Sequence, residues 1–358
     1  MKFKLCFLAL VVLAACPARA GEWNYEIEGH ARALYGYSDV KDHHHGIGRG
    51  WLSSMIGYDF DNGVSAGLYA LLNGGIDREL QDYNQGRWGE EVYGVVDSDY
   101  GQLMVGQVYN VASLFHNGAP SVGAFAANTD IVDFIANPNW KRNSKETRFA
   151  TLTATDLNTD GVAPKISYIS PEFYGAAVGF SYMPDSYNRR GLINKHAGYA
   201  HDDGFVGAAY FDHDWGWFFS KASIGYAQYH GNDKEYSAAL NISRGNWNIG
   251  GGFRKTYIDG EDKSTPDRKL PLDFDGYREG YAWNIGIGYE IGPFASALTY
   301  FDSKAKHSDN RNKMVAFSNQ YQFNKYIDVY AAAAYVDYDA ADESKHGYAL
   351  VTGLGVNF

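Results

Sequence analysis

The C-terminal segment, residues 348–358, restricts the fold more than any other feature, because its side chains alternate between two kinds. Successive side chains of a β-strand point to opposite faces, so every second residue shares a face. One face is mostly large and apolar, and the other is mostly small. The first face consists of Tyr348, Leu350, Thr352, Leu354, Val356 and Phe358. This pattern is typical of a strand that faces lipid, and if the strand closes a barrel, the rest of the chain should repeat it.

The alternation does return along the chain, beginning at residues 23–37. Its apolar face there consists of Trp23, Tyr25, Ile27, Gly29, Ala31, Ala33, Tyr35 and Tyr37. Residues 174–182 and 281–289 repeat the pattern. Aromatic residues at both ends of an apolar face indicate two interfacial girdles around a water-filled interior. A soluble sandwich would turn its polar face outward and would favour Val, Ile and Leu over tyrosine girdles. The pattern predicts an all-β, antiparallel transmembrane barrel.

The first 20 residues have the features of a secretory signal. Lys2 and Lys4 precede an apolar run from Leu5 to Ala15, which is too short to span a bilayer as a helix. Ala18-Arg19-Ala20 then offers a cleavage site before Gly21. We therefore expect residues 1–20 to be removed and residues 21–358 to form one barrel domain. The alternative is a lipoprotein, because Leu13-Ala14-Ala15-Cys16 also fits a lipoprotein cleavage box.

Turn-forming residues divide the chain into seventeen candidate strands, with short and long connections in alternation. Short periplasmic turns and long external loops are typical of outer-membrane barrels. With both termini on the periplasmic side the number of strands must be even, so we assign residues 195–202 to the fourth external loop. Sixteen strands remain. Eighteen would follow if residues 146–155 formed a further strand.

Composition supports a barrel and argues against nucleic-acid binding. The chain is rich in Tyr (29), Phe (20) and Gly (41), which barrel walls use, and it has only 9 Pro. Loss of residues 1–20 would remove three basic residues and no acidic one, so the net charge would change from -11 to -14. A protein that binds phosphate backbones needs basic patches, and this balance disfavours it.

The longest segment that lacks a strand pattern is residues 111–161. A structureless stretch of this length is unusual in a compact soluble domain. In a wide barrel it can fold inward and narrow the lumen. We therefore predict that this third loop forms a constriction.

The segment after this loop, Tyr168-Ile-Ser-Pro-Glu-Phe-Tyr-Gly175, resembles a turn found in general porins of Gram-negative outer membranes. The terminal strand ending at Phe358 is similar to the assembly signal of that family. The resemblance implies a homotrimer of sixteen-stranded barrels in the bacterial outer membrane, in contact with lipid and lipopolysaccharide. It also implies passive diffusion of ions and small hydrophilic solutes. We expect no cofactor, and we expect no catalysis because the sequence lacks the familiar catalytic motifs.

Porins of this family usually present acids on the third loop opposite basic residues of the wall. The resemblance places Asp130 and Asp133 among the acids here. Four basic residues have the inward phase of their segments, namely Arg32, Arg49, Arg87 and Lys165. Opposed charges would set up a transverse field across the constriction. Each basic residue could instead be an interior ion-pair strut.

Other candidate sites are weaker. Asp156, Asn158 and Asp160 have the opening spacing of a calcium loop, but Ser167 stands where a complete loop has a bidentate Glu. Residues 42–45, Asp-His-His-His, could bind a metal or form a solvated loop tip. The sequence has no familiar hydrolase or phosphate-binding motif. A surface adhesin or receptor that uses loops near residues 38 and 258, or a hydrolase barrel with fewer strands, remains an alternative to the channel.

Overall fold

A computed structural model describes residues 21–39, 43–77, 91–123, 134, 151–186, 203–229, 233–257, 279–306, 309–340 and 343–358. The predicted signal segment, residues 1–20, lies outside this part of the chain. The strands are β1 (Gly21–Ser38), β2 (His43–Phe60), β3 (Ser65–Asp77), β4 (Glu91–Ser98), β5 (Gly101–Gln107), β6 (Pro164–Ile169), β7 (Ala176–Met183), β8 (Gly204–Asp214), β9 (Phe219–Gln228), β10 (Lys234–Arg244), β11 (Trp247–Tyr257), β12 (Gly280–Ile291), β13 (Phe294–Ala305), β14 (Arg311–Asn324), β15 (Ile327–Ala340) and β16 (Glu343–Asn357).

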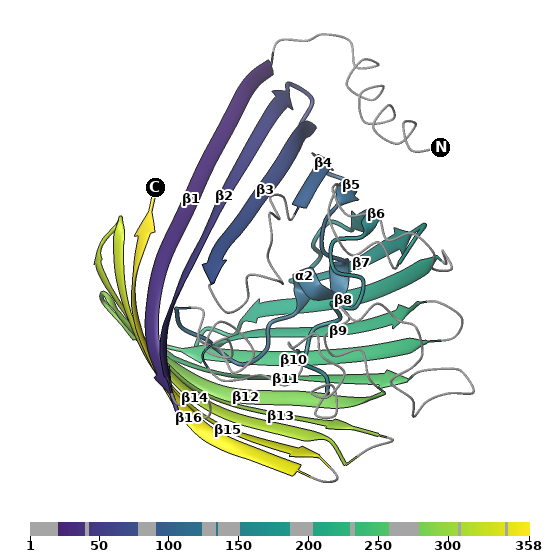
Figure 1. The fold of residues 1–358 in the computed structure, drawn as a ribbon. Helices are drawn as coiled ribbons and strands as arrows, with labels where there is room; N and C mark the ends of the chain where they lie inside the picture. Colours follow the sequence, from purple (N-terminus) through teal and green to yellow (C-terminus); the bar gives the residue numbers. More distant parts are fainter. Residues whose placement is uncertain are drawn as a thin grey trace.

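The sixteen strands form one closed antiparallel barrel in which each strand pairs with its neighbours in sequence. Figure 1 shows the wall running from β1 in purple to β16 in yellow, and these two strands pair to close it. At this seam Phe358 and Gly29 exchange backbone hydrogen bonds of 3.0 and 2.8 Å. A methyl group at Gly29 would lie 2.2 Å from the Phe358 ring. The absence of a side chain at Gly29 thus makes room for the terminal aromatic ring at the closing edge.

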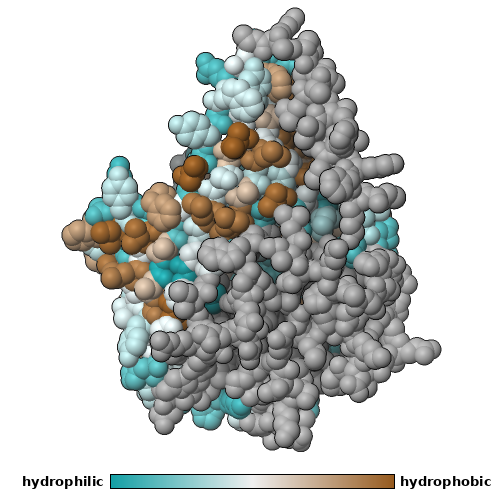
Figure 2. All heavy atoms as spheres, turned by 45° about the horizontal axis from the view of Figure 1, so that its top comes forward, coloured by the Kyte–Doolittle hydropathy of each residue, from teal (hydrophilic) through white to brown (hydrophobic). Residues whose placement is uncertain are grey.

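The outer face carries the apolar side chains that the alternation predicts. In β16 the outward residues Leu350, Leu354 and Val356 are exposed, whereas inward Ala349 and Val351 are buried. Exposed and buried side chains alternate in the same way along β7 and β12. Figure 2 shows hydrophobic side chains gathered into a band on the face in view, with hydrophilic ones beyond it. Since such a band suits a bilayer core, the predicted lipid-facing phase is confirmed.

Tight turns join the strands at one end of the barrel, and the connections after β3, β5, β7 and β11 at the other end are much longer. The connections after β2, β4, β6, β8, β10, β12 and β14 are tight, and positive φ at Gly63, Gly216, Gly245 and Gly292 allows several of them. Residues 195–202, assigned to a loop, lie outside the described residues. Of the possible extra strand at 146–155, residues 151–155 are described and do not pair as a strand. The barrel thus has the sixteen strands that parity predicts.

Two outer connections, for which turn-forming residues predict loops at 38–50 and 339–345, are shorter than predicted. In the second, β15 ends at Ala340 and β16 begins at Glu343. The segment from residue 38 to 50 reads as a loop because it is rich in Gly and His, yet β2 begins at His43. The backbone of β2 pairs with β1 up to the last pair of the register, His43 with Ser38. Pairing with a long neighbouring strand therefore outweighed the local turn propensity. The histidines at 43–45 belong to a strand and not to a loop tip, and the ring of His44 stacks on Tyr35 at 5.8 Å.

The predicted loop 111–161 begins with a short helix, α2 (Val111–Phe115), which the sequence reading missed. Asn110 caps it, since its side-chain oxygen accepts a 3.0 Å hydrogen bond from the Ser113 amide. Figure 1 shows α2 inside the barrel, where it packs against β6 to β9. No helix in the described part of the chain has the length and hydrophobicity to cross a membrane. The described parts of the third loop thus lie in the lumen, as predicted.

Candidate pore constriction

The base of the inner loop is held by a buried polar network at β6. Lys165 forms an ion pair of 2.9 Å with Asp160, and neither side chain has any exposed surface. The Lys165 ammonium also donates to the carbonyl oxygens of Val108 and Gly161. Asp160 accepts from the Asn110 amide at 2.5 Å and from the Tyr229 hydroxyl at 3.0 Å. A buried charge needs this degree of compensation, so the network fixes both ends of the loop to the wall.

A second buried network joins the loop to β10 and β11. Arg254 of β11 pairs with Glu235 of β10 at 2.8 Å, and both are almost fully buried on the inward face. Arg254 donates to Asn158 at 2.8 Å and to Thr159 at 2.6 Å, and Thr159 donates to Glu235 at 2.5 Å. The loop therefore supplies the polar groups that satisfy an otherwise isolated ion pair of the wall.

Between these anchors the loop follows the wall closely. Ala112 and Leu157 lie over Gly225 of β9, where an added methyl group would lie 2.8 Å from Ala112 and 3.2 Å from Leu157. Farther round, Asn284 of β12 accepts from the Ala119 amide at 3.2 Å and donates to Thr155 at 3.2 Å. Small or amide side chains on the inner wall thus let the loop approach the backbone.

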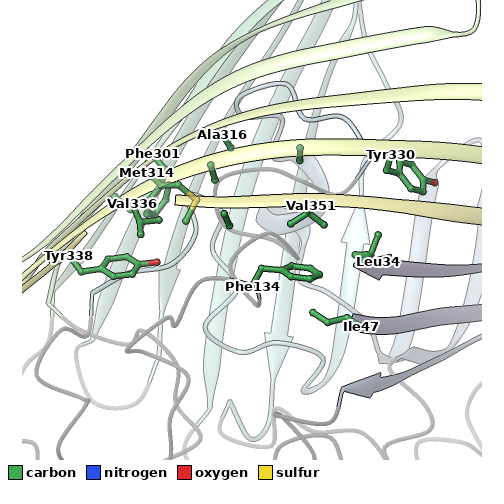
Figure 3. Packing of buried hydrophobic residues seen from close by; sticks show 14 of the residues in the cluster. Leu34, Ile47, Phe134, Phe301, Met314, Ala316, Tyr330, Val336, Tyr338 and Val351 are labelled. Atoms are coloured by element: carbon green, nitrogen blue, oxygen red, sulfur yellow. The ribbon is translucent and has the colours of Figure 1, made fainter. Parts of the chain in front are cut away.

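Phe134 brings the loop to the opposite side of the barrel. Its ring is completely buried and belongs to a cluster with Leu34 of β1, Ile47 of β2 and Val351 of β16. Figure 3 shows the ring lying among these three side chains. A methyl group at Gly36 would lie 2.6 Å from the ring, so the glycine provides its seat. The loop therefore contacts both sides of the lumen and narrows it.

Two arginines lie next to this contact. Arg32 of β1 and Arg49 of β2 are directly paired in the register, two residues from Leu34 and Ile47 respectively. Both side chains point inward, because the inward phase of each strand is set by the buried Leu34 and Ile47. Both are half-buried. Two positive charges thus face each other across neighbouring strands at the height where Phe134 meets the wall.

Known proteins share the sequence pattern and the fold of this chain. Residues 8–341 match the sequence model of Gram-negative porins. The chain belongs to the Gram-negative porin family. An anion-selective porin from Comamonas acidovorans is similar in structure, with a TM-score of 0.62 and 16% identity over 94% of this chain and 100% of the other. Salmonella typhi OmpF, in complex with daunomycin, gives a TM-score of 0.64 and 12% identity over 93% and 97%. The outer-membrane channel DcaP of Acinetobacter baumannii gives 0.61 and 12% over 96% and 99%. No curated protein matches the sequence.

The porin is an outer-membrane protein that forms a channel for passive diffusion. Of its predicted constriction residues, Arg32 and Arg49 lie together on the inner wall. Lys165 has the predicted inward phase, but its ammonium is enclosed by the base of the loop and does not face open solvent. Arg87, Asp130 and Asp133 lie outside the described residues.

The predicted calcium ligands lie at the base of the porin's loop, where their oxygens accept from different protein donors. Asp156 accepts from the Ser113 hydroxyl at 2.7 Å, whereas Asn158 and Asp160 bind Arg254 and Lys165. A calcium ion would have to replace an arginine and a lysine. No group of three or more His, Cys, Asp or Glu side chains in the described part of the chain is arranged to hold a metal.

Sequence reading missed the residues that hold the loop, namely Asn110, Tyr229, Glu235, Arg254 and His116. The inward phase of Glu235 and Arg254 on predicted strands could have marked them as candidates. Their shared partner in the loop, Thr159, is about 75 to 95 residues away in the chain, so the sequence does not indicate this contact. His116 lies 2.9 Å from the Thr155 hydroxyl. Burial lowers the pKa of His116 below 6.5, against the nearby negative charge of Asp156. The buried imidazole therefore favours its neutral form.

Proposed function

We propose that the Arg32–Arg49 pair forms the basic side of the porin's constriction and sets its ion preference. The observation that carries this proposal is their direct pairing on the inward face beside Phe134, the point where the loop reaches the wall. Like charges held together in a narrow, low-dielectric lumen raise the local potential and attract anions. The channel then favours anions over cations of similar size.

The acidic side of the proposed constriction consists of Asp130 and Asp133, with Arg87 as a further basic residue of the wall. Asp133 directly precedes Phe134 in the chain, which supports its place near the arginines. Opposed charges would orient polar solutes and penalise apolar ones. Lys165 is left out of the proposed selectivity set, because its charge is compensated within the loop base.

Reversal potentials test the role of the arginines. We expect the double variant Arg32→Ala, Arg49→Ala to form channels in planar bilayers and to lower the anion-to-cation permeability ratio by about twofold or more in a KCl gradient. Arg244→Ala is the matched control, since Arg244 lies over Trp217 at the tight-turn end of β10. A reversal potential unchanged in the double variant would reject the proposed filter.

The resemblance to general porins supports three further parts of the proposal. The first is a homotrimer, for which the same recordings should show conductance steps in groups of three. The second is a multi-pass position in the bacterial cell outer membrane, in contact with lipid and lipopolysaccharide. The third is a role of Phe358 as an assembly signal, which its place on the outer face of the seam supports. We propose neither catalysis nor nucleic-acid binding.

A further inference from the structure

An aromatic track follows the inner wall from the arginine pair toward the end of the barrel that carries the tight turns. We define the track by four residues, His30, Trp51, Tyr69 and Tyr93. Trp51 pairs with His30 across β1 and β2, and Tyr69 pairs with Tyr93 across β3 and β4. Trp51 shares the inward phase of Arg49, two residues away. The interior of a porin is normally polar, so a row of rings along the lumen calls for a reason.

Trp51 is the most unusual member of the track. Four tryptophans lie in the described strands, and Trp23, Trp247 and Trp283 all have the outward phase. Trp51 alone among them points inward, and 37% of its surface stays exposed. An indole open to water gains little from burial, whereas the same indole in a pore offers a flat apolar face to a passing solute.

The ring beside Trp51 is held in place by hydrogen bonds. The imidazole of His30 lies 6.2 Å from the indole with an interplanar angle of 27°. His30 Nδ1 donates to Asn357 at 2.7 Å, and Asn357 donates to the buried Asp328 at 2.7 Å. These two hydrogen bonds, which join β1 to β16 and β16 to β15, hold the imidazole of His30 in place beside the indole. A preorganised ring pair loses little entropy when a ligand stacks on it.

The second ring pair extends the same surface. The rings of Tyr69 and Tyr93 are 5.0 Å apart and inclined at 36°, and both are half-buried. Met55 of β2 faces Tyr69 in the register, and it lies four residues beyond Trp51 on the same face. The described parts of the inner loop pack against other strands or near Phe134. Between Arg49 and Tyr93, the described wall therefore offers aromatic rings to the lumen.

We infer that Arg32, Arg49 and Trp51 form a binding site for aromatic carboxylates on their way through the pore. The arginine pair attracts the carboxylate, and the indole of Trp51 receives the ring. Two residues on one face of a strand are about 7 Å apart, which matches a ring joined to its carboxylate by a short linker. This inference rests on the proposed role of the Arg32–Arg49 pair and names the class of solute that the channel favours.

Block of ion current by small solutes tests this inference with the full-length porin in planar bilayers. The probes are 3-phenylpropionate, acetate as the anion without a ring, and 3-phenylpropanol as the ring without a charge. We expect 3-phenylpropionate to block at a concentration about tenfold below either of the other two. Trp51→Ala should abolish this advantage, and Trp51→Phe should keep most of it. Trp247→Ala, which removes an indole from the lipid face, should behave as the parent protein.

The possible results distinguish failure of the aromatic-carboxylate site from failure of the proposal on which it rests. Parent channels that acetate, 3-phenylpropanol and 3-phenylpropionate block equally would overturn the aromatic site and leave the channel intact. The same conclusion would follow if Trp51→Ala kept the advantage of 3-phenylpropionate. A reversal potential that is unchanged in the Arg32→Ala, Arg49→Ala variant would instead overturn the proposed selectivity filter. If Trp51→Ala does not insert, the comparison of the three probes on the parent and on Trp51→Phe still decides the question.

Discussion

The inner wall of the barrel has two regions that use charge in opposite ways. On β6 to β11, Lys165 and Arg254 are buried under the loop, and each forms an ion pair with a carboxylate. On β1 and β2, Arg32 and Arg49 are half-buried and are paired with each other in the register. Basic residues of the same inward phase thus serve as struts in one region and as candidate selectivity residues in the other.

The loop creates this difference. Where it lies against the wall, the wall has small residues such as Gly225, and water is replaced by loop groups. A charge under such a cover must be compensated, because an unpaired charge in a low dielectric is very costly. Beside Phe134 the loop touches the wall through an apolar ring, and the neighbouring arginines keep access to solvent. The position of the loop therefore decides which inward charge acts on solutes.

The largest effect should follow from breaking a strut. Arg254→Met leaves Glu235 buried without its cation and also removes the donors to Asn158 and Thr159. Loss of one partner of a buried pair costs about 3–5 kcal/mol. We expect the end of the loop to detach, so that single-channel conductance rises and the urea midpoint of the folded porin falls.

The outward pair of Lys313 and Asp337 provides the matched control. It has a similar separation, 3.1 Å, but both side chains are about one-third exposed. Such pairs contribute about 0–1 kcal/mol, so Lys313→Met should change neither conductance nor the urea midpoint appreciably. Equal losses in Lys313→Met and Arg254→Met would show that burial under the loop does not distinguish the two regions.

A smaller effect is expected at the contact between loop and open wall. Phe134→Ala removes a fully buried ring that seats on Gly36 among Leu34 and Ile47. Truncation of a buried Phe costs about 3–5 kcal/mol in a rigid core, and a loop can recover part of this by relaxing. We expect higher conductance and weaker ion preference in bilayer recordings. Phe317→Ala on the lipid face is the control, and it should leave both quantities unchanged.

The sequence predicted the barrel well because its signal is local. Period-two alternation determines the face of each residue, and it placed Arg32, Arg49 and Lys165 correctly on the inward phase. Whether an inward charge is open or enclosed depends on contacts that are distant in sequence. Lys165 is enclosed by the carbonyl of Val108, 57 residues away, and no local pattern reports that contact.

Helix α2 shows a different limit. Asn110 followed by Val-Ala-Ser is a possible helix start, because Asn is a favoured N-cap. A helix of five residues, however, shows too little periodicity to stand out within fifty residues of loop. Its stability comes from packing of Val111 and Ala112 against Leu157 and strand residues, which sequence alone does not reveal.

The smallest expected effect concerns the pH dependence of the covered region. Burial lowers the pKa of His116 in the folded porin, so the unfolded loop binds a proton more readily than the folded one. The stability of this contact is thus fully present above pH 6.5 and is lost as the pH falls through the lower folded pKa. Amide hydrogen exchange of residues 111–116, corrected for the intrinsic pH effect, should be faster at pH 5 than at pH 7.5. His116→Gln should reduce this difference, whereas His213→Gln, away from the loop, should retain it. An identical difference in His116→Gln would mean that another group controls the loop.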